Sequence, residues 1–112
     1  MYLIKDMPYQ ERPRERLAKL GAHSLNTYEL VAILLRAGTK HESVIEVSKQ
    51  LINELNTLSD LKEMSISEMT KVNGIGKTKA ITIKAALELG RRVNESREET
   101  IQLSSPKTVY DL

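Results

Sequence analysis

Apolar residues recur along most of this 112-residue chain at the three- and four-residue intervals that are typical of amphipathic helices. One such stripe lies within residues 27–38, a second within 44–55, and the longest within 77–93. Strand-like alternation is nearly absent before residue 100. The pattern therefore predicts an all-α fold of five or six short helices joined by short connections.

Residues that start and stop helices agree with this pattern. Pro13 suits the first turn of a helix that Gly21 would end. A brief helical piece is expected from Ser59. Three pairs have the spacing of an N-terminal capping box: Asn26 with Glu29, Ser43 with Glu46, and Ser65 with Glu68.

Residues 72–77 read Val-Asn-Gly-Ile-Gly-Lys and connect the short helix after Ser65 to the long one. Two glycines allow a tight turn and leave no Cβ over the start of the long helix. The first-turn N–H groups and the positive end of the helix dipole then form a seat for a phosphate. Ile75 would fill the gap between the helices, and the small Ala80 would let them pack closely. The stretch predicts a helix-hairpin-helix that grips a nucleic-acid backbone; a plain helix connector is the alternative.

A faint internal repeat surrounds this motif. Gly38 and Gly74 each precede apolar residues at the same offsets, Val44 and Val47 after the first, and Ala80 and Ile83 after the second. The first copy lacks the second glycine. One interpretation is a tandem, pseudo-duplicated pair that presents both hairpins on one edge. Unrelated helices separated by glycine turns would produce the same pattern.

The net charge of +2 conceals an uneven distribution. Residues 71–92 hold six basic and one acidic side chain, whereas residues 41–70 hold two basic and six acidic ones. Basic charge concentrated on one element attracts polyanions even when the whole chain is nearly neutral. A solvated helix face is the alternative for a charge run alone, but this run coincides with the hairpin.

The hairpin therefore supplies the candidate DNA contacts. In the main copy they are Gly74, Ile75, Gly76, Lys77, Thr78, Lys79 and Lys84, with Thr39, Lys40 and Ser43 as weaker counterparts in the first copy. The chain has four tyrosines and neither Phe nor Trp, so an aromatic platform for stacked bases is poorly supported. Non-specific binding to duplex or branched DNA is expected. The arginines at 12, 14 and 16 either widen the basic strip or pair with Glu11 and Glu15.

The sequence offers few candidates for catalytic residues, metal ligands or a membrane-spanning segment. The chain has no cysteine and only two histidines, His23 and His41, both expected in solvent-facing turns. No serine, lysine or histidine lies in a known nucleophile motif. Asp60, Glu63 and Glu68 are expected to form a solvated acidic face. We therefore expect no catalytic residues, metal ligands or cofactor, no signal peptide or membrane span, and a cytoplasmic location.

Several stretches together resemble the amino-terminal domain of the bacterial RadC-like (DNA repair protein RadC) proteins. They are residues 7–17, 25–39, 72–77 and 85–92, of which the Glu-Arg-Pro-Arg-Glu-Arg and Leu-Leu-Arg-Ala-Gly-Thr segments are the most specific. The resemblance implies a role in DNA repair or recombination, and it allows a monovalent cation held by hairpin carbonyls. It also implies a following domain similar to the JAB1/MPN zinc metallopeptidases, whose zinc site this chain cannot assemble.

The expected domain organisation follows from that resemblance. Residues 1–94 form the helix-hairpin-helix domain, and residues 95–112 are a linker and the truncated start of the MPN-like domain. Residues 95–99 are polar, residues 100–103 alternate like a strand, and Ser105-Pro106 is typical of a helix start.

A rival hypothesis makes the chain a docking or regulatory module for the metallopeptidase domain or a repair partner. Its surface would use the acidic block 41–70 and apolar residues such as Val31 and Leu35, unless these two lie in the core.

Overall fold

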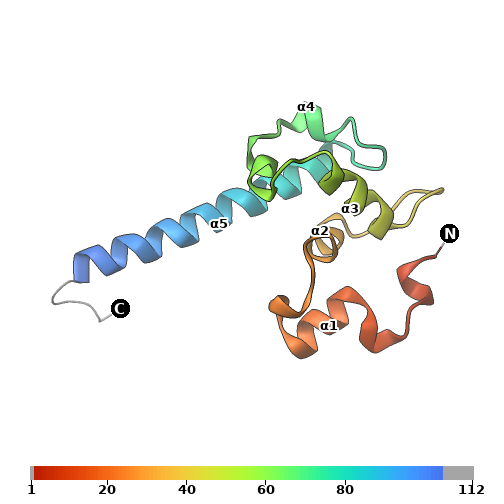
Figure 1. The fold of residues 1–112 in the computed structure, drawn as a ribbon, viewed down its shortest axis with the longest axis horizontal. Coiled ribbons are helices and arrows are strands. Elements are labelled where there is room, and N and C mark those ends of the chain that lie inside the picture. The colour runs from red at the N-terminus through yellow and green to blue at the C-terminus, as the bar shows by residue number, and fades with distance from the viewer. Residues whose placement is uncertain (1, 105–112) are drawn as a thin grey trace.

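The computed structural model describes residues 2–104, and the side chains of residues 2–96. The described residues form five α-helices: α1 (Pro13–Leu20), α2 (Thr27–Leu35), α3 (Val44–Asn53), α4 (Ile66–Met69) and α5 (Lys77–Ser104). Four short 3-10 helices accompany them: η1 (Ile4–Asp6), η2 (Tyr9–Glu11), η3 (Ala22–Ser24) and η4 (Leu58–Glu63). The described part contains no strand, so the all-α prediction is confirmed (Figure 1).

Side-chain caps begin three of these helices where the sequence predicts them. Asn26 and Glu29 each accept the other's backbone N–H at 3.0 Å, which satisfies two amides at the start of α2. Ser65 and Glu68 make the same reciprocal pair before α4. Ser43 caps α3 through a 3.2 Å bond from the N–H three residues later. At the other end of α1, Gly21 adopts the left-handed φ of 96°.

The core lies where α2, α3, α4 and α5 meet (Figure 1). Its most deeply buried apolar side chains are Leu35, Val47, Leu51, Met69, Ala80 and Ile83. Burying one large apolar side chain contributes about 1.5–3 kcal/mol, so this cluster holds the four helices together. Val31 is 5% and Leu35 1% exposed, which assigns both to the core and not to a docking surface.

Two loops lie side by side at the end of the molecule opposite the C-terminal end of α5 (Figure 1). The first loop (residues 36–43) joins α2 to α3, and the second loop (residues 70–76) joins α4 to α5. Asn73 of the second loop donates to the Glu42 carboxylate of the first at 3.2 Å. A Cβ added to Gly74 would lie 3.0 Å from Cγ2 of Thr39, so the backbone of the second loop packs closely against a side chain of the first.

The long helix runs further than the sequence predicts. The sequence predicts a helix that ends near Val93, a polar linker at 95–99 and a strand at 100–103, but all of these residues are helical. Alternation over four residues is a weak strand signal, and ion pairs one turn apart support the helix instead. The helix expected from Ser105-Pro106 lies outside the described residues. The domain boundary near residue 94 stays a prediction.

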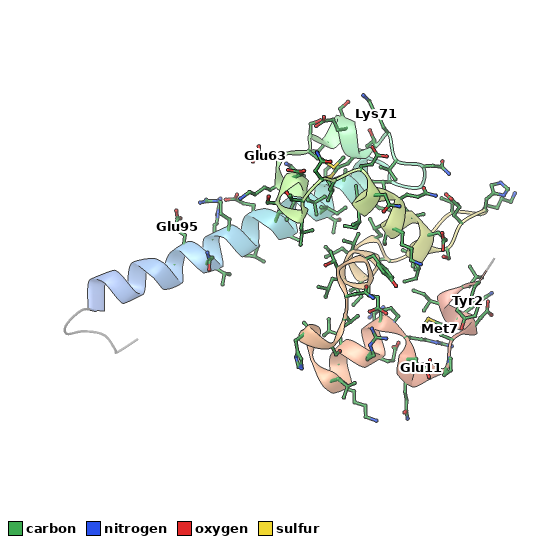
Figure 2. All side chains as sticks on the ribbon, in the orientation of Figure 1. Tyr2, Met7, Glu11, Glu63, Lys71 and Glu95 are labelled. Carbon is green, nitrogen blue, oxygen red and sulfur yellow. The ribbon has the colours of Figure 1, made fainter. Side chains whose placement is uncertain are left out.

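Two arginines lie well inside the extended helix. Arg91 and Arg92 are far from the end of α5 at Ser104. Both pair with Glu88, at 3.0 and 2.8 Å, and Arg91 also reaches Glu95 at 3.3 Å. Glu95 projects from the exposed part of α5 (Figure 2). These pairs support the helix after it leaves the core.

Candidate nucleic-acid interface

The N-terminus of α5 is open to solvent. Gly76 precedes the helix, and its carbonyl accepts the Ala80 N–H at 3.0 Å. A Cβ built on Gly76 would have no heavy atom within 4 Å. Asn26, Ser43 and Ser65 cap α2, α3 and α4, whereas glycine has no side chain with which to cap α5. Among the described residues, no acceptor binds the backbone N–H groups of residues 77–79.

The charge at this helix end has the sign that favours an anion. Lys77 and Thr78 are exposed, and α5 has no acidic residue in its first turn. The positive end of the helix dipole repels lysine, so each cation there opposes helix stability by about 0.3–1 kcal/mol. A negative group bound to the amides would reverse the sign of that interaction.

Gly74 and Ile75 shape the second loop, and both pack against neighbouring side chains. Gly74 has a φ of 97°, and a Cβ there would lie 2.8 Å from Cγ2 of Val47. Ile75 is only 2% exposed and packs in the core, as the sequence predicts. These two residues fix the path of the chain into Gly76.

Lys79 ties the two loops together. Its ammonium group donates to the carbonyl of Ala37 in the first loop and to that of Gly74, the latter at 3.4 Å. The side chain is therefore partly buried between the loops. Its positive charge remains near the α5 N-terminus, but its hydrogen bonds hold the fold.

Lys84 lies away from the helix start. Seven residues of α-helix separate it from Lys77, a rise of about 10 Å. Its ammonium group donates to the carbonyls of Met64 at 2.8 Å and Lys62 at 3.1 Å, at the end of η4. The structure therefore does not bring Lys84 together with the other candidate residues.

The first loop is closed by its own polar groups. The Thr39 hydroxyl accepts the N–H groups of His41 and Glu42 at 3.1 and 2.9 Å. The Ser43 hydroxyl caps α3 and is buried. Only Lys40 of the three first-copy candidates is exposed. The two loops are thus adjacent but unequal, because the second alone leads into an uncapped helix.

Among the described side chains, the N-terminal arginines form no ion pair with Glu11 or Glu15, although Arg16 donates to the backbone carbonyl of Glu11 at 3.3 Å. Arg16 instead forms an ion pair with Glu29, which is largely buried, and so joins α1 to α2. Arg12 donates to the backbone carbonyls of Met7 and Lys5 at 3.3 and 2.9 Å. Sequence reasoning missed both roles because the partners carry no local signal.

Asp60 and Glu68 each accept backbone N–H groups at the start of a separate helical turn. Asp60 accepts the N–H groups of Thr57 and Asn56, and these bonds hold its pKa below the ordinary value. The Ser65 N–H bond likewise lowers the pKa of Glu68. Glu63 projects outward (Figure 2). The described residues contain no group of three His, Cys, Asp or Glu side chains that could hold a metal ion.

The exposed histidines agree with the sequence prediction: His23 and His41 both lie at the surface. Within residues 2–104, no helix is both long enough and apolar enough to cross a bilayer.

The fold and the candidate interface define an all-α module with two adjacent loops and one open helix N-terminus. The chain belongs to the UPF0758 family: residues 4–81 match the sequence profile described as UPF0758 N-terminal. Membership of the family is therefore confirmed, whereas the helix-hairpin-helix and the following metallopeptidase domain stay predictions.

Curated relatives are bacterial proteins of the same family. UPF0758 protein YsxA of Bacillus subtilis is 50% identical over 105 residues, which cover 93% of this chain and 46% of that protein. UPF0758 protein GK2618 of Geobacillus kaustophilus is 50% identical over 95 residues, 85% of this chain and 42% of the relative. UPF0758 protein ABC2615 of Shouchella clausii is 45% identical over 111 residues, which cover 98% of this chain and 48% of that protein.

The chain thus spans somewhat less than half the length of these relatives. No solved structure matches it. The relatives' names state no activity.

Proposed function

We propose that this chain is a sequence-independent DNA-backbone binding module in which α4, the second loop and α5 form a helix-hairpin-helix. The observation that carries the proposal is the start of α5, where an uncapped helix N-terminus coincides with exposed Lys77. Amides without acceptors and a positive dipole end are suited to a phosphate. Contacts of this kind recognise the backbone and carry no base sequence.

The residues divide into two roles in this proposal. The phosphate oxygens accept the open N–H groups after Gly76, with Lys77 and the Thr78 hydroxyl beside them. Lys40 of the neighbouring loop supplies a second positive charge at the same edge. Gly74, Ile75 and Lys79 hold the loops in place, and Lys79 adds its charge without giving up its carbonyl partners.

The number of phosphates contacted sets the salt dependence. Each neutralised phosphate contributes a slope of about −0.9 to log affinity against log salt on duplex DNA. If both loops together contact about four phosphates, the slope is about −3.6. Affinity in the non-specific range, on the order of 10⁻⁴ to 10⁻⁶ M, is expected at physiological salt.

Fluorescence anisotropy with labelled duplex, branched and single-stranded oligonucleotides tests the proposal. Lys77→Glu places a negative charge at the proposed phosphate seat and leaves the Lys79 and Lys84 hydrogen bonds intact. Lys19→Glu makes the same charge change in the last turn of α1, on an exposed side chain. We expect Lys77→Glu to weaken duplex binding at least tenfold and Lys19→Glu to change it little. Equal affinities for the two variants would refute a localised interface.

A monovalent cation held by the loop carbonyls stays a prediction, and two of these carbonyls already accept hydrogen bonds. The carbonyl of Val72 accepts the Ile75 N–H at 3.0 Å, and that of Gly74 accepts the Lys79 ammonium. The positive charge that such a cation would bring is already provided by Lys79.

The second candidate function is a docking module for the portion of the relatives that this chain does not cover. Leu89 and Val93 lie one turn apart on α5, and their side chains are 65% and 63% exposed. Exposed apolar residues at this spacing favour contact with another protein surface. Docking predicts binding that is indifferent to heparin, whereas DNA binding predicts competition by heparin and a steep salt dependence.

We extend the proposal to the whole protein only through the RadC-like resemblance. A cytoplasmic role in DNA repair or recombination would follow, with this chain acting in binding and not in catalysis. Zinc metallopeptidase chemistry would then belong to the remaining portion of the full-length relatives.

A further inference from the structure

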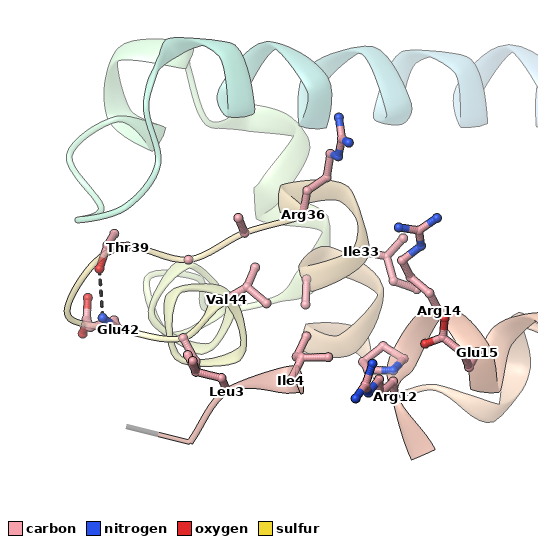
Figure 3. Close-up of a pocket in the computed structure, with 15 residues that line it drawn as sticks. Leu3, Ile4, Arg12, Arg14, Glu15, Ile33, Arg36, Thr39, Glu42 and Val44 are labelled. Atoms are coloured by element: carbon pink, nitrogen blue, oxygen red, sulfur yellow. Dashed lines mark hydrogen bonds between the residues drawn. The ribbon is translucent and has the colours of Figure 1, made fainter. Parts of the chain in front are cut away.

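A cleft of about 470 Å³ lies between the N-terminal segment, α1, α2 and the first loop. Its volume is within the range of small-molecule sites, which is about 300–1,000 Å³. Ile4, Ile33 and Val44 line it and give it an apolar floor (Figure 3). The cleft is separate from the open end of α5, and the proposed DNA contacts leave it unused.

Two arginines on this cleft have no hydrogen-bond or ion-pair partner among the described side chains of residues 2–96. Of the six arginines within residues 2–96, four donate hydrogen bonds to carbonyls or carboxylates. Arg14 and Arg36 make neither a hydrogen bond nor an ion pair within that part of the chain, and both line the cleft. Arg14 lies next to Ile33, and Arg36 extends toward α5 (Figure 3). Free guanidinium groups above an apolar floor are suited to a ligand with an anionic group and an apolar body.

The backbone at Arg36 is strained in a way that favours glycine. Its φ is 73° and its ψ is −50°, and the Ala37 N–H bonds to the Leu35 carbonyl at 2.8 Å across it. This γ-turn with positive φ is rare for a residue with a side chain. Lys79 donates to the Ala37 carbonyl beside this turn, but that bond does not involve the Arg36 side chain. Strain of this kind concentrates at functional positions, so the guanidinium itself is the feature that needs a role.

The acidic residues of the cleft leave the arginines free. Glu42 accepts from the side-chain amides of Gln50 and Asn73. Glu15 also lines the cleft but forms no ion pair with either arginine.

We propose that the cleft binds a small organic phosphate of nucleotide size. The phosphate binds the guanidinium groups of Arg14 and Arg36, and the planar or apolar body packs on Ile4, Ile33 and Val44. Arginine's planar fork matches phosphate oxygens in a bidentate arrangement. The outer face of a DNA duplex would leave the apolar floor empty, because its bases are stacked inside. The proposal is therefore independent of the DNA-binding function.

The test is calorimetric titration of the chain with each of the four common 5′-nucleoside monophosphates, the matching nucleosides, inorganic phosphate and a short DNA duplex. Arg36→Gly removes the guanidinium and relieves the positive φ, so this variant should melt at a higher temperature than the wild type. Arg14→Gln provides a second loss of charge in the cleft. Arg92→Gln, an exposed arginine on α5 outside the cleft, is the matched control.

We expect at least one monophosphate to bind saturably and at least tenfold more tightly than inorganic phosphate or its nucleoside. Arg36→Gly and Arg14→Gln should each weaken this binding at least tenfold, and Arg92→Gln should not change it. Absence of binding by all four monophosphates would overturn the proposal. So would equal affinity for inorganic phosphate, equal binding by Arg36→Gly, or displacement of the nucleotide by the duplex.

Discussion

Replacing Gly76 by aspartate should separate the proposed DNA binding from the stability of the fold. A Cβ at this position meets no other atom, and the φ of Gly76 lies outside the left-handed region, so the side chain can be added without strain. As the residue before α5, aspartate can accept the open N–H groups of Thr78 or Lys79. The substitution therefore gives α5 the kind of cap that Asn26 already gives α2.

The two effects of Gly76→Asp have opposite signs. The cap adds a few tenths of a kcal/mol relative to glycine, and the carboxylate adds about 0.3–1 kcal/mol at the positive dipole end. Together these should raise the melting temperature by roughly 2–6 °C. The same carboxylate blocks and repels the phosphate, and lost hydrogen bonds to a charged group cost about 1.5–3 kcal/mol. Duplex affinity should therefore fall by about ten- to a hundredfold.

Anisotropy and thermal melting on the same samples measure both effects. Gly76→Ala is the matched control, because it adds a Cβ but leaves the amides open and should bind nearly as well as the wild type. If Gly76→Asp melts at a higher temperature and still binds duplex DNA as tightly as Gly76→Ala, the amides do not bind phosphate.

Three other predictions concern residues that hold the second loop and α5 in place. Lys84→Met removes two hydrogen bonds to backbone carbonyls, so it should lower the free energy of unfolding by roughly 1–3 kcal/mol in chemical denaturation. It should leave the slope of log DNA affinity against log salt unchanged. A smaller slope would show that Lys84 contacts DNA. Gly74→Ala forces a Cβ to within 2.8 Å of Val47 at a φ of 97°, so it should destabilise the fold by about 1–3 kcal/mol, and a neutral effect would contradict the packing. Hydrogen bonds from Arg91 and Arg92 lower the pKa of Glu88 from 4.5 to about 2. The contribution of ionised Glu88 to stability is therefore fully present above pH 4.5 and is lost as the pH falls toward 2. The helicity of Glu88→Gln, followed by circular dichroism, should depend less on pH in that window than the helicity of the wild type. Identical pH profiles for the two proteins would refute this role of Glu88.

Signals that act within a few residues made the helix starts predictable. Asn26 and Glu29 bond to each other's backbone, so their spacing alone locates the start of α2. The burial of Ile75 and Ala80 likewise follows from the apolar period and the glycine turn. The open helix end at Gly76 could be predicted because a glycine cannot cap.

Contacts between distant residues could not be predicted. The Lys79 ammonium reaches a carbonyl 42 residues away and that of Lys84 reaches carbonyls 20 and 22 residues away, so a count of positive charge overstated what is free to bind DNA. The positive φ of Arg36 has no signature in the sequence, because glycine is the usual residue at such a position. The extension of α5 was missed because its polar residues 95–99 resembled a linker.

The most direct test of the central claim is a ¹H–¹⁵N correlation spectrum recorded during titration with duplex DNA at low salt. We predict that the largest amide shifts fall on residues 76–79, that a smaller set falls near Lys40, and that added salt reverses both. Shifts confined to the Leu89–Val93 face, or amides at the start of α5 that do not move while DNA binds, would contradict the account.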